Sequence, residues 1–138
     1  MRGHLRISRR PDVVFDAVVD EPSWNPGMSS VEWLTPPPVG VGSKYRAVLG
    51  GRWVTQVEFV EFDRPHRLRS RTTSSWLWTE GPLTFEEDGA GVTRMSWDWE
   101  YRLTGRARLL APLFLIVGGR WERANWMRMR DYVERQQS

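Results

Sequence analysis

Residues 92–103 read VTRMSWDWEYRL, and apolar and polar side chains alternate along this stretch. One face of the predicted strand carries the large side chains of Met95, Trp97, Trp99 and Tyr101. Alternation with period two is typical of a strand with one buried face and one face in water. We therefore expect Val92 to Leu103 to belong to an antiparallel sheet whose inner face is rich in aromatic rings.

Four further strand-like segments precede this one, and short turns separate them. Gly50-Gly51 and the glycine-bearing residues 88–91 are typical hairpin connections, so the segments predict a meander. The alternation slips near Gly81-Pro82, which predicts a β-bulge there. The predicted strands are Lys44 to Leu49, Trp53 to Phe62, Arg67 to Thr73 and Trp76 to Glu86.

The N-terminal part of the chain predicts a strand, a short helix and another strand. Pro11 suits the first turn of a helix that runs to Val19, because its missing N–H is not needed there. Glu21 to Pro26 holds two prolines and predicts a turn or a single helical turn. The predicted strands are His4 to Ser8 and Ser30 to Leu34, and the three prolines at 36–38 place the second at a sheet edge.

Helical character returns from about Gly105 to Gln136. Two apolar stripes follow this segment, and Gly118-Gly119 lies between them as a plausible bend. One kinked helix satisfies both stripes, and two helices joined near the glycines are the alternative. The first stripe holds Leu110, Phe114, Val117 and Trp121, and the second holds Trp126, Met129 and Val133.

Composition narrows the class of protein. A chain of 138 residues predicts one domain over residues 1–138, and the absence of cysteine excludes disulfides and thiolate chemistry. The net charge of +3 comes from arginines interleaved with acidic residues, so we expect no nucleic-acid partner. We find no signal peptide and no run of about twenty apolar residues, so a cytoplasmic protein without stable membrane insertion is expected.

Several short motifs in this order resemble those of the START-like (SRPBCC) superfamily, whose branches include polyketide cyclase/dehydrase-like and Bet v 1-like proteins. Residues 9–20 (RRPDVVFDAVVD) resemble its opening helix, residues 38–45 (PVGVGSKY) its glycine-rich approach to a strand, and residues 63–68 (DRPHRL) a proline turn. The resemblance covers Leu5 to Glu134. It implies an α+β helix-grip fold, in which an antiparallel sheet of six to seven strands curves around a long C-terminal helix.

Such a sheet and helix can enclose an apolar pocket, and nine tryptophans are available to line it. The alternative is that these bulky rings fill the core and leave no pocket. Strand phase and the first helical stripe predict the following ligand-binding residues: Tyr45, Thr55, Val57, Trp76, Trp78, Trp97, Trp99, Phe114, Val117 and Trp121.

Polar candidates for chemistry are few. Glu80 points inward if it continues the phase of Trp76 and Trp78, and burial would then raise its pKa and suit it to acid–base work beside Tyr45 and Tyr101. An exposed Glu80 at the predicted bulge is the alternative.

Other polar groups have surface roles in this interpretation. Asn125 and Arg128 reach the pocket only if the first helical stripe continues, and we favour solvent positions for both. Asp98 and Glu100 face outward, where arginines of 67–71 could pair with them. The two histidines give no metal-binding pattern, so no metal and no cofactor are expected.

The sequence therefore favours a module that binds a small hydrophobic or aromatic molecule, as a monomer or a homodimer. An enzyme resembling the polyketide cyclases would use the same pocket and would need the polar candidates together inside it. A third possibility is an interaction protein with a filled core and exposed tryptophans.

Overall fold

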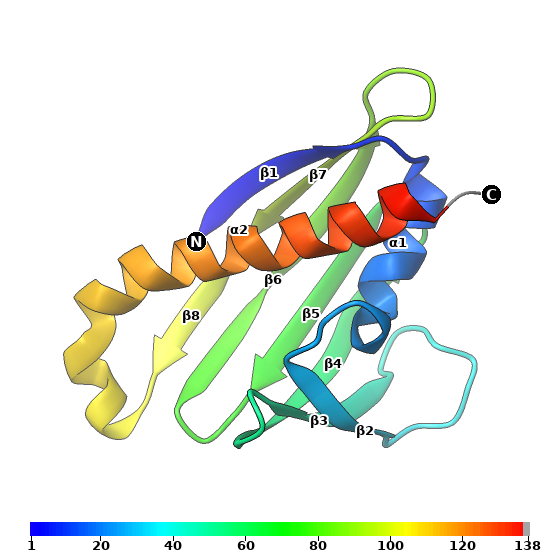
Figure 1. The fold of residues 1–138 in the computed structure, drawn as a ribbon. Helices are drawn as coiled ribbons and strands as arrows, with labels where there is room; N and C mark the ends of the chain where they lie inside the picture. The colour runs from blue at the N-terminus through cyan, green and yellow to red at the C-terminus, as the bar shows by residue number, and fades with distance from the viewer. Residues whose placement is uncertain (137–138) are drawn as a thin grey trace.

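The computed structural model describes residues 1–136 and places every strand in one eight-stranded antiparallel sheet (Figure 1). The order across the sheet is β1-β7-β6-β5-β4-β3-β2, and β8 pairs with β6 beyond the end of β7. The strands are β1 (Arg2–Ile7), β2 (Met28–Trp33), β3 (Lys44–Leu49), β4 (Trp53–Asp63), β5 (Arg67–Thr73), β6 (Leu77–Glu87), β7 (Thr93–Asp98) and β8 (Glu100–Leu103).

The helices lie on one face and at one end of this sheet. Figure 1 shows α2 (Ala111–Arg135) crossing the sheet, with α1 (Pro11–Val19) near its C-terminal turns. A 3-10 helix, η1 (Glu21–Ser23), follows α1, and a second, η2 (Gly105–Leu110), leads into α2. This is the predicted helix-grip fold of a curved antiparallel sheet and a long C-terminal helix. No described helix is long and apolar enough to span a membrane.

The C-terminal segment is one uninterrupted helix from Ala111 onward, so the alternative of two helices joined at Gly118-Gly119 is wrong. Glycine at 118 permits close packing, because a Cβ there would lie 3.3 Å from the Met1 sulfur and 3.4 Å from the Phe114 ring. The second predicted stripe is buried, with Trp126, Met129 and Val133 all at most 5% exposed.

The predicted edge position of the strand before the three prolines is confirmed, because β2 is the last strand of the sheet. The predicted strand Val92 to Leu103 is divided at Trp99 into β7 and β8, which raises the strand count above the six to seven expected. Both pieces pair with β6 in one continuous register, from Leu77↔Leu103 to Glu87↔Thr93.

The β-bulge predicted near Gly81-Pro82 is wrong. β6 keeps an unbroken register with β5 through these residues, and the bulges occur instead in β4 and β2, between Phe59 and Glu61 and between Ser29 and Glu32. Glycine is needed at 81 for another reason: a Cβ there would lie 2.1 Å from the Asp98 carbonyl oxygen of the neighbouring strand.

The core forms where α1 and the C-terminal half of α2 pack on the sheet. Phe15 of α1 contacts Phe62 and Phe85 edge-on, with ring centroids 5.1 and 5.2 Å apart. The ring of Trp126 lies between Trp24 and Trp97, at 5.8 and 6.2 Å. This packing is concentrated at one end of the sheet, whereas the other end, under the first turns of α2, encloses a cavity.

Candidate functional site

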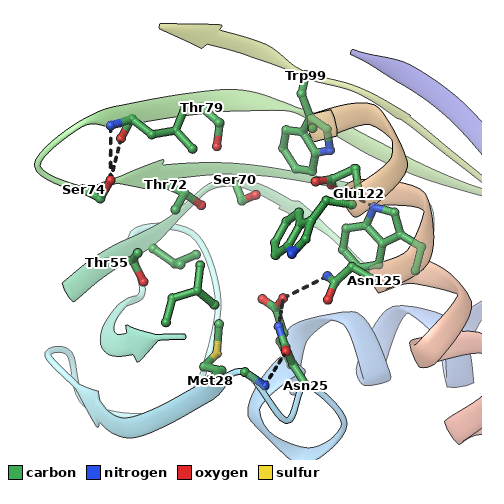
Figure 2. A pocket seen from close by; sticks show the side chains of 18 of the residues that line it. Asn25, Met28, Thr55, Ser70, Thr72, Ser74, Thr79, Trp99, Glu122 and Asn125 are labelled. Atoms are coloured by element: carbon green, nitrogen blue, oxygen red, sulfur yellow. Dashed lines mark hydrogen bonds between the residues drawn. The ribbon is translucent and has the colours of Figure 1, made fainter. Parts of the chain in front are cut away.

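A cavity of about 480 Å³ lies between the concave face of the sheet and α2 (Figure 2). Strands β3 to β6 form its floor, α2 covers it, and η1 with the residues that follow closes one end. Its volume is in the range of pockets that hold drug-sized molecules. The core is therefore not filled by the aromatic rings, which removes the main structural premise of an interaction protein with a solid core.

Aromatic and aliphatic side chains make up most of the cavity wall. The cavity opens between β4 and the first turns of α2, where the wall residues Trp53, Val117 and Trp121 are exposed, and we call this opening the mouth. Trp76 links its two sides, because its ring lies 6.0 Å from Trp53 on β4 and 6.5 Å from Phe114 on α2. The remaining apolar wall consists of Met1, Val18, Met28, Tyr45, Leu49, Val57, Phe59, Leu68, Leu77, Leu83, Trp99, Val117, Trp121 and Trp126. Binding here would remove most of the apolar surface of a ligand from water.

A row of hydroxyl groups crosses the floor. Ser70, Thr72 and Ser74 follow one another at alternate positions of β5 and the turn after it, so all three face the cavity, and Thr55 and Thr79 flank them on β4 and β6 (Figure 2). The Thr55 hydroxyl donates to the Ala47 carbonyl at 3.4 Å and the Ser74 hydroxyl to the Leu77 carbonyl at 3.2 Å. These groups offer hydrogen bonds to a ligand along an otherwise apolar floor.

The closed end of the cavity holds a carboxyl group in a network of polar side chains. Glu21 Oε1 accepts from Asn25 Nδ2 at 3.1 Å and from Asn125 Nδ2 at 3.4 Å, and its other oxygen accepts from the Tyr45 hydroxyl at 3.4 Å. Burial raises the pKa of Glu21, and these hydrogen bonds offset only part of that effect. Burial and the nearby Glu21 charge raise the pKa of Tyr45 well above its ordinary value.

A second carboxyl group, Glu122 of α2, faces the same end. Its Oε1 accepts from the Trp126 indole N–H at 2.9 Å. Burial, and then the charge of Glu21, raise the pKa of Glu122 to about 7. The Glu122 side chain is half-buried and borders the cavity together with Trp99 and Trp126. Glu122 therefore changes charge near neutral pH.

Two indole N–H groups have no partner among the described residues. Trp99 Nε1 and Trp76 Nε1 are both buried without a hydrogen bond. The Trp99 N–H is directed toward Glu122 and lowers the pKa of that carboxyl, which opposes the effect of burial. The closed end thus contains acceptors on two carboxyl groups and one unpaired donor.

Most of the predicted lining residues do border the cavity. Strand phase placed the residues of β3 and β4 correctly, as well as Trp99 between β7 and β8, and the first helical stripe placed those of α2. The predicted residues found in the cavity wall are Tyr45, Thr55, Val57, Trp76, Trp99, Phe114, Val117 and Trp121.

Two predicted lining residues are misplaced. Trp78 lies on the outer face of the sheet, where the Arg102 guanidinium stacks on its ring at 4.9 Å. The prediction continued the phase of Trp76 into β6, but Trp76 precedes the strand, so its direction does not set that of Trp78. Trp97 faces inward but packs against Trp126 in the core instead of bordering the cavity.

The prediction that Glu80 points inward is also wrong, because it too continued the phase of Trp76 into β6. Its carboxylate pairs with Arg69 at 2.9 Å and with Arg71 at 2.7 Å on the outer face. The hydrogen bond from Arg71 lowers the pKa of Glu80, the opposite of the predicted shift. Tyr101 packs on Phe114 with ring centroids 4.7 Å apart and lies outside the cavity wall, so of the three catalytic candidates only Tyr45 borders the cavity.

Asn125 is buried in the cavity wall, contrary to the solvent position we favoured, whereas Arg128 borders the cavity but is exposed to solvent, as we favoured. Arg128 donates to the Asn125 side-chain oxygen at 3.2 Å, and Asn125 is 2% exposed. Asp98 faces outward as predicted but pairs with Arg2 at 3.3 Å rather than with the arginines of β5.

The two carboxyl groups of the cavity were missed by the sequence analysis. Glu21 was assigned only to a turn. Glu122 lies one helical turn before Trp126, the first residue of the buried stripe. A spacing of four residues places Glu122 on that stripe, so extending it backward would have found the residue. No group of three or more His, Asp or Glu side chains that could hold a metal occurs among residues 1–136.

Comparison with solved structures supports the fold. The chain aligns with a START superfamily protein from Mycobacterium smegmatis with a TM-score of 0.82 at 14% identity, covering 97% of this chain and 96% of that one. It aligns with the Zhui aromatase/cyclase from Streptomyces sp. R1128 with a TM-score of 0.72 at 16% identity, covering 98% of this chain and 93% of that one. It aligns with norcoclaurine synthase from Thalictrum flavum with a TM-score of 0.69 at 14% identity, covering 99% of this chain and 86% of that one.

At these identities the likeness establishes the fold alone. No curated protein matches the sequence. The family model described as "Polyketide cyclase / dehydrase and lipid transport" matches residues 2–134. Because this match spans nearly the whole chain, the protein belongs to the polyketide cyclase/dehydrase and lipid transport family of START-like helix-grip proteins.

Proposed function

We propose that the protein binds one small hydrophobic or aromatic molecule in the cavity, with a hydrogen-bond donor of that molecule at the carboxyl end. The observation that carries this proposal is the open 480 Å³ cavity. Its wall is mostly apolar, and its polar groups include the hydroxyl row, the two carboxyl groups and the side chains of Asn25, Asn125 and Arg128. An apolar pocket with a few convergent polar groups is the usual form of a small-molecule site. The body of the ligand would contact the tryptophans.

The polar end favours a ligand that donates hydrogen bonds. Glu21 and Glu122 supply acceptor oxygens, and the charge of Glu21 raises the pKa of Glu122. A hydroxyl or amine group placed between them would relieve that repulsion by donating to one carboxylate or both. Ligands that carry only acceptors, such as a carboxylate, would instead meet like charge.

The first test is native mass spectrometry of the purified protein before and after organic extraction, with analysis of the extract for apolar compounds. We expect a co-purifying mass that extraction removes. Thr72→Phe would fill the cavity and abolish that mass. Thr73→Phe is the matched control, because the adjacent position on β5 faces the outer side of the sheet. Equal ligand loading in both variants would contradict binding in the cavity.

One observation favours a second function, that of a cyclase-like enzyme. Glu122 has a pKa of about 7 beside an apolar pocket, and a group that titrates near the working pH is suited to transfer protons. Tyr45 and Glu21 would position a carbonyl or enol of the substrate. The test is conversion of a short poly-β-ketone thioester, followed by the absorbance of an aromatic product. Glu122→Gln should lose conversion but keep binding, and conversion unchanged by this variant would exclude Glu122 as the proton carrier.

A further inference from the structure

The start of the C-terminal helix carries a run of apolar side chains that the protein leaves in water. We define the apolar segment as residues 109–117, which read LLAPLFLIV. Its leucine, isoleucine and valine side chains are between 54% and 83% exposed: Leu109, Leu110, Leu113, Leu115, Ile116 and Val117. A contiguous exposed patch of this kind is rare on a monomeric protein and marks an interaction site.

The fold explains why this segment has no partner within the protein. Figure 1 shows η2 and the first turns of α2 at the end of the sheet where β8 stops. The later turns of α2 bury Trp126, Met129 and Val133, but the first turns bury no side chain fully. Apolar residues occur on several sides of these turns, so a single strand or helix of the same chain could not cover them all.

The apolar segment borders the mouth of the cavity. Phe114 and Val117 belong both to the segment and to the cavity wall, and Trp121 continues that wall one turn later. Trp53 of β4, which also lines the cavity, is 40% exposed, and its neighbour Val54 is 55% exposed. Whatever covers the apolar segment therefore lies next to the route into the cavity.

The charges around the segment indicate an anionic partner. Arg106, Arg108 and Arg120 flank it, all three are exposed, and no ion pair engages them among the described residues. No acidic residue occurs between Glu100 and Glu122. A second copy docked symmetrically through this segment would bring two sets of arginines together, and the segment has no acidic residues to balance their charge. An anionic lipid surface offers both an apolar layer and negative charge.

We propose that residues 105–121 dock the protein reversibly on an anionic lipid surface, with the apolar segment at the headgroup–acyl boundary and the three arginines among the headgroups. Helical segments with exposed leucines and flanking arginines bind in the plane of a membrane in this way. The mouth of the cavity then faces the lipid, and an apolar molecule enters or leaves without crossing water. Docking itself does not require the cavity to be occupied.

The test is co-sedimentation of the full chain with vesicles of phosphatidylcholine alone or mixed with phosphatidylserine. We expect binding to the mixed vesicles that weakens with salt, and weaker binding to phosphatidylcholine alone. Leu113→Ser with Ile116→Ser should lower the partition coefficient about tenfold or more on mixed vesicles. Arg106→Gln with Arg108→Gln should lower it by a similar factor on mixed vesicles only.

Two controls match these variants. Val41→Ser alters an apolar side chain that is 71% exposed in the loop before β3, and Arg94→Gln removes an exposed charge from β7. Both should bind vesicles like the original protein. Absence of binding to the mixed vesicles, or equal loss in the controls, would overturn the proposal. A stable dimer in light scattering that Leu113→Ser with Ile116→Ser dissociates would also overturn it, in favour of a second copy as the occupant.

Discussion

The carboxyl group of Glu122 should make the stability of the protein depend on pH in a way that one substitution removes. Its pKa rises from 4.5 to about 7 in the folded protein, because of burial and the charge of Glu21. The folded state therefore binds a proton more tightly than the unfolded chain. The stability from this group is fully present below pH 4.5 and is lost as the pH rises toward and through 7.

The magnitude follows from the two pKa values. At 1.36 kcal/mol for each pKa unit, the shift from 4.5 to about 7 sets an upper limit of about 3 kcal/mol on the stability lost. Glu122 is only half-buried, so solvent screens part of its charge, and we expect a loss of about 2 kcal/mol between pH 5 and pH 8. The raised pKa of Glu21 acts in the same direction.

The assay is urea unfolding of the original protein and of Glu122→Gln at pH 5 and pH 8, followed by circular dichroism. The glutamine oxygen can still accept the hydrogen bond from Trp126, so the variant should match the original at pH 5. At pH 8 it should be more stable by about 2 kcal/mol. Glu80→Gln is the control, because this carboxyl lies on the outer face and has a lowered pKa. Parallel pH profiles for the original protein and Glu122→Gln would show that the Glu122 carboxyl does not cause the pH dependence.

Three further substitutions test the fold. Glu80→Gln should lower the free energy of unfolding by about 1 kcal/mol at neutral pH, because it weakens two ion pairs with β5. This difference should shrink as the pH falls below 4.5 and through the lowered pKa of Glu80. Gly81→Ala should lower it by about 2 kcal/mol or more, since the new Cβ would meet the Asp98 carbonyl oxygen and neither backbone can yield easily. Gly119→Ala should raise it by about 0.5–1 kcal/mol, because nothing lies within 4 Å of the added Cβ and alanine favours the helix. Urea unfolding measures all three, and a neutral Gly81→Ala or a destabilising Gly119→Ala would contradict the packing described.

The sheet and its C-terminal helix could be predicted because their signals are local. Alternation along residues 92–103 sets which side chains face inward, and the structure follows it through Met95, Trp97 and Trp99. The three prolines after β2 predict a sheet edge, because proline cannot donate a ladder hydrogen bond, and β2 is an edge strand. Each of these inferences needs only the neighbours of a residue along the chain.

The errors in β6 arose where a local signal was carried across a boundary. Trp76 points into the cavity from the turn before the strand, and the prediction extended that direction to Trp78 and Glu80. The glycine at 81 was then interpreted as a bulge that restored the phase. In the structure the phase never changes, and the glycine makes room for a carbonyl group of the adjacent strand, which no pattern within β6 could indicate.

The carboxyl pair shows where sequence reasoning ends. Glu122 could have been found, since it precedes Trp126 by four residues and so shares its helical stripe. Glu21 could not, because it reaches the cavity only when η1 lies beside β3 and α2, which bring Tyr45 and Asn125 to its two oxygens. The pKa of Glu122 near 7 depends on burial and on the charge of Glu21. The property that makes this end of the cavity chemically distinctive thus arises from tertiary contacts between segments a hundred residues apart.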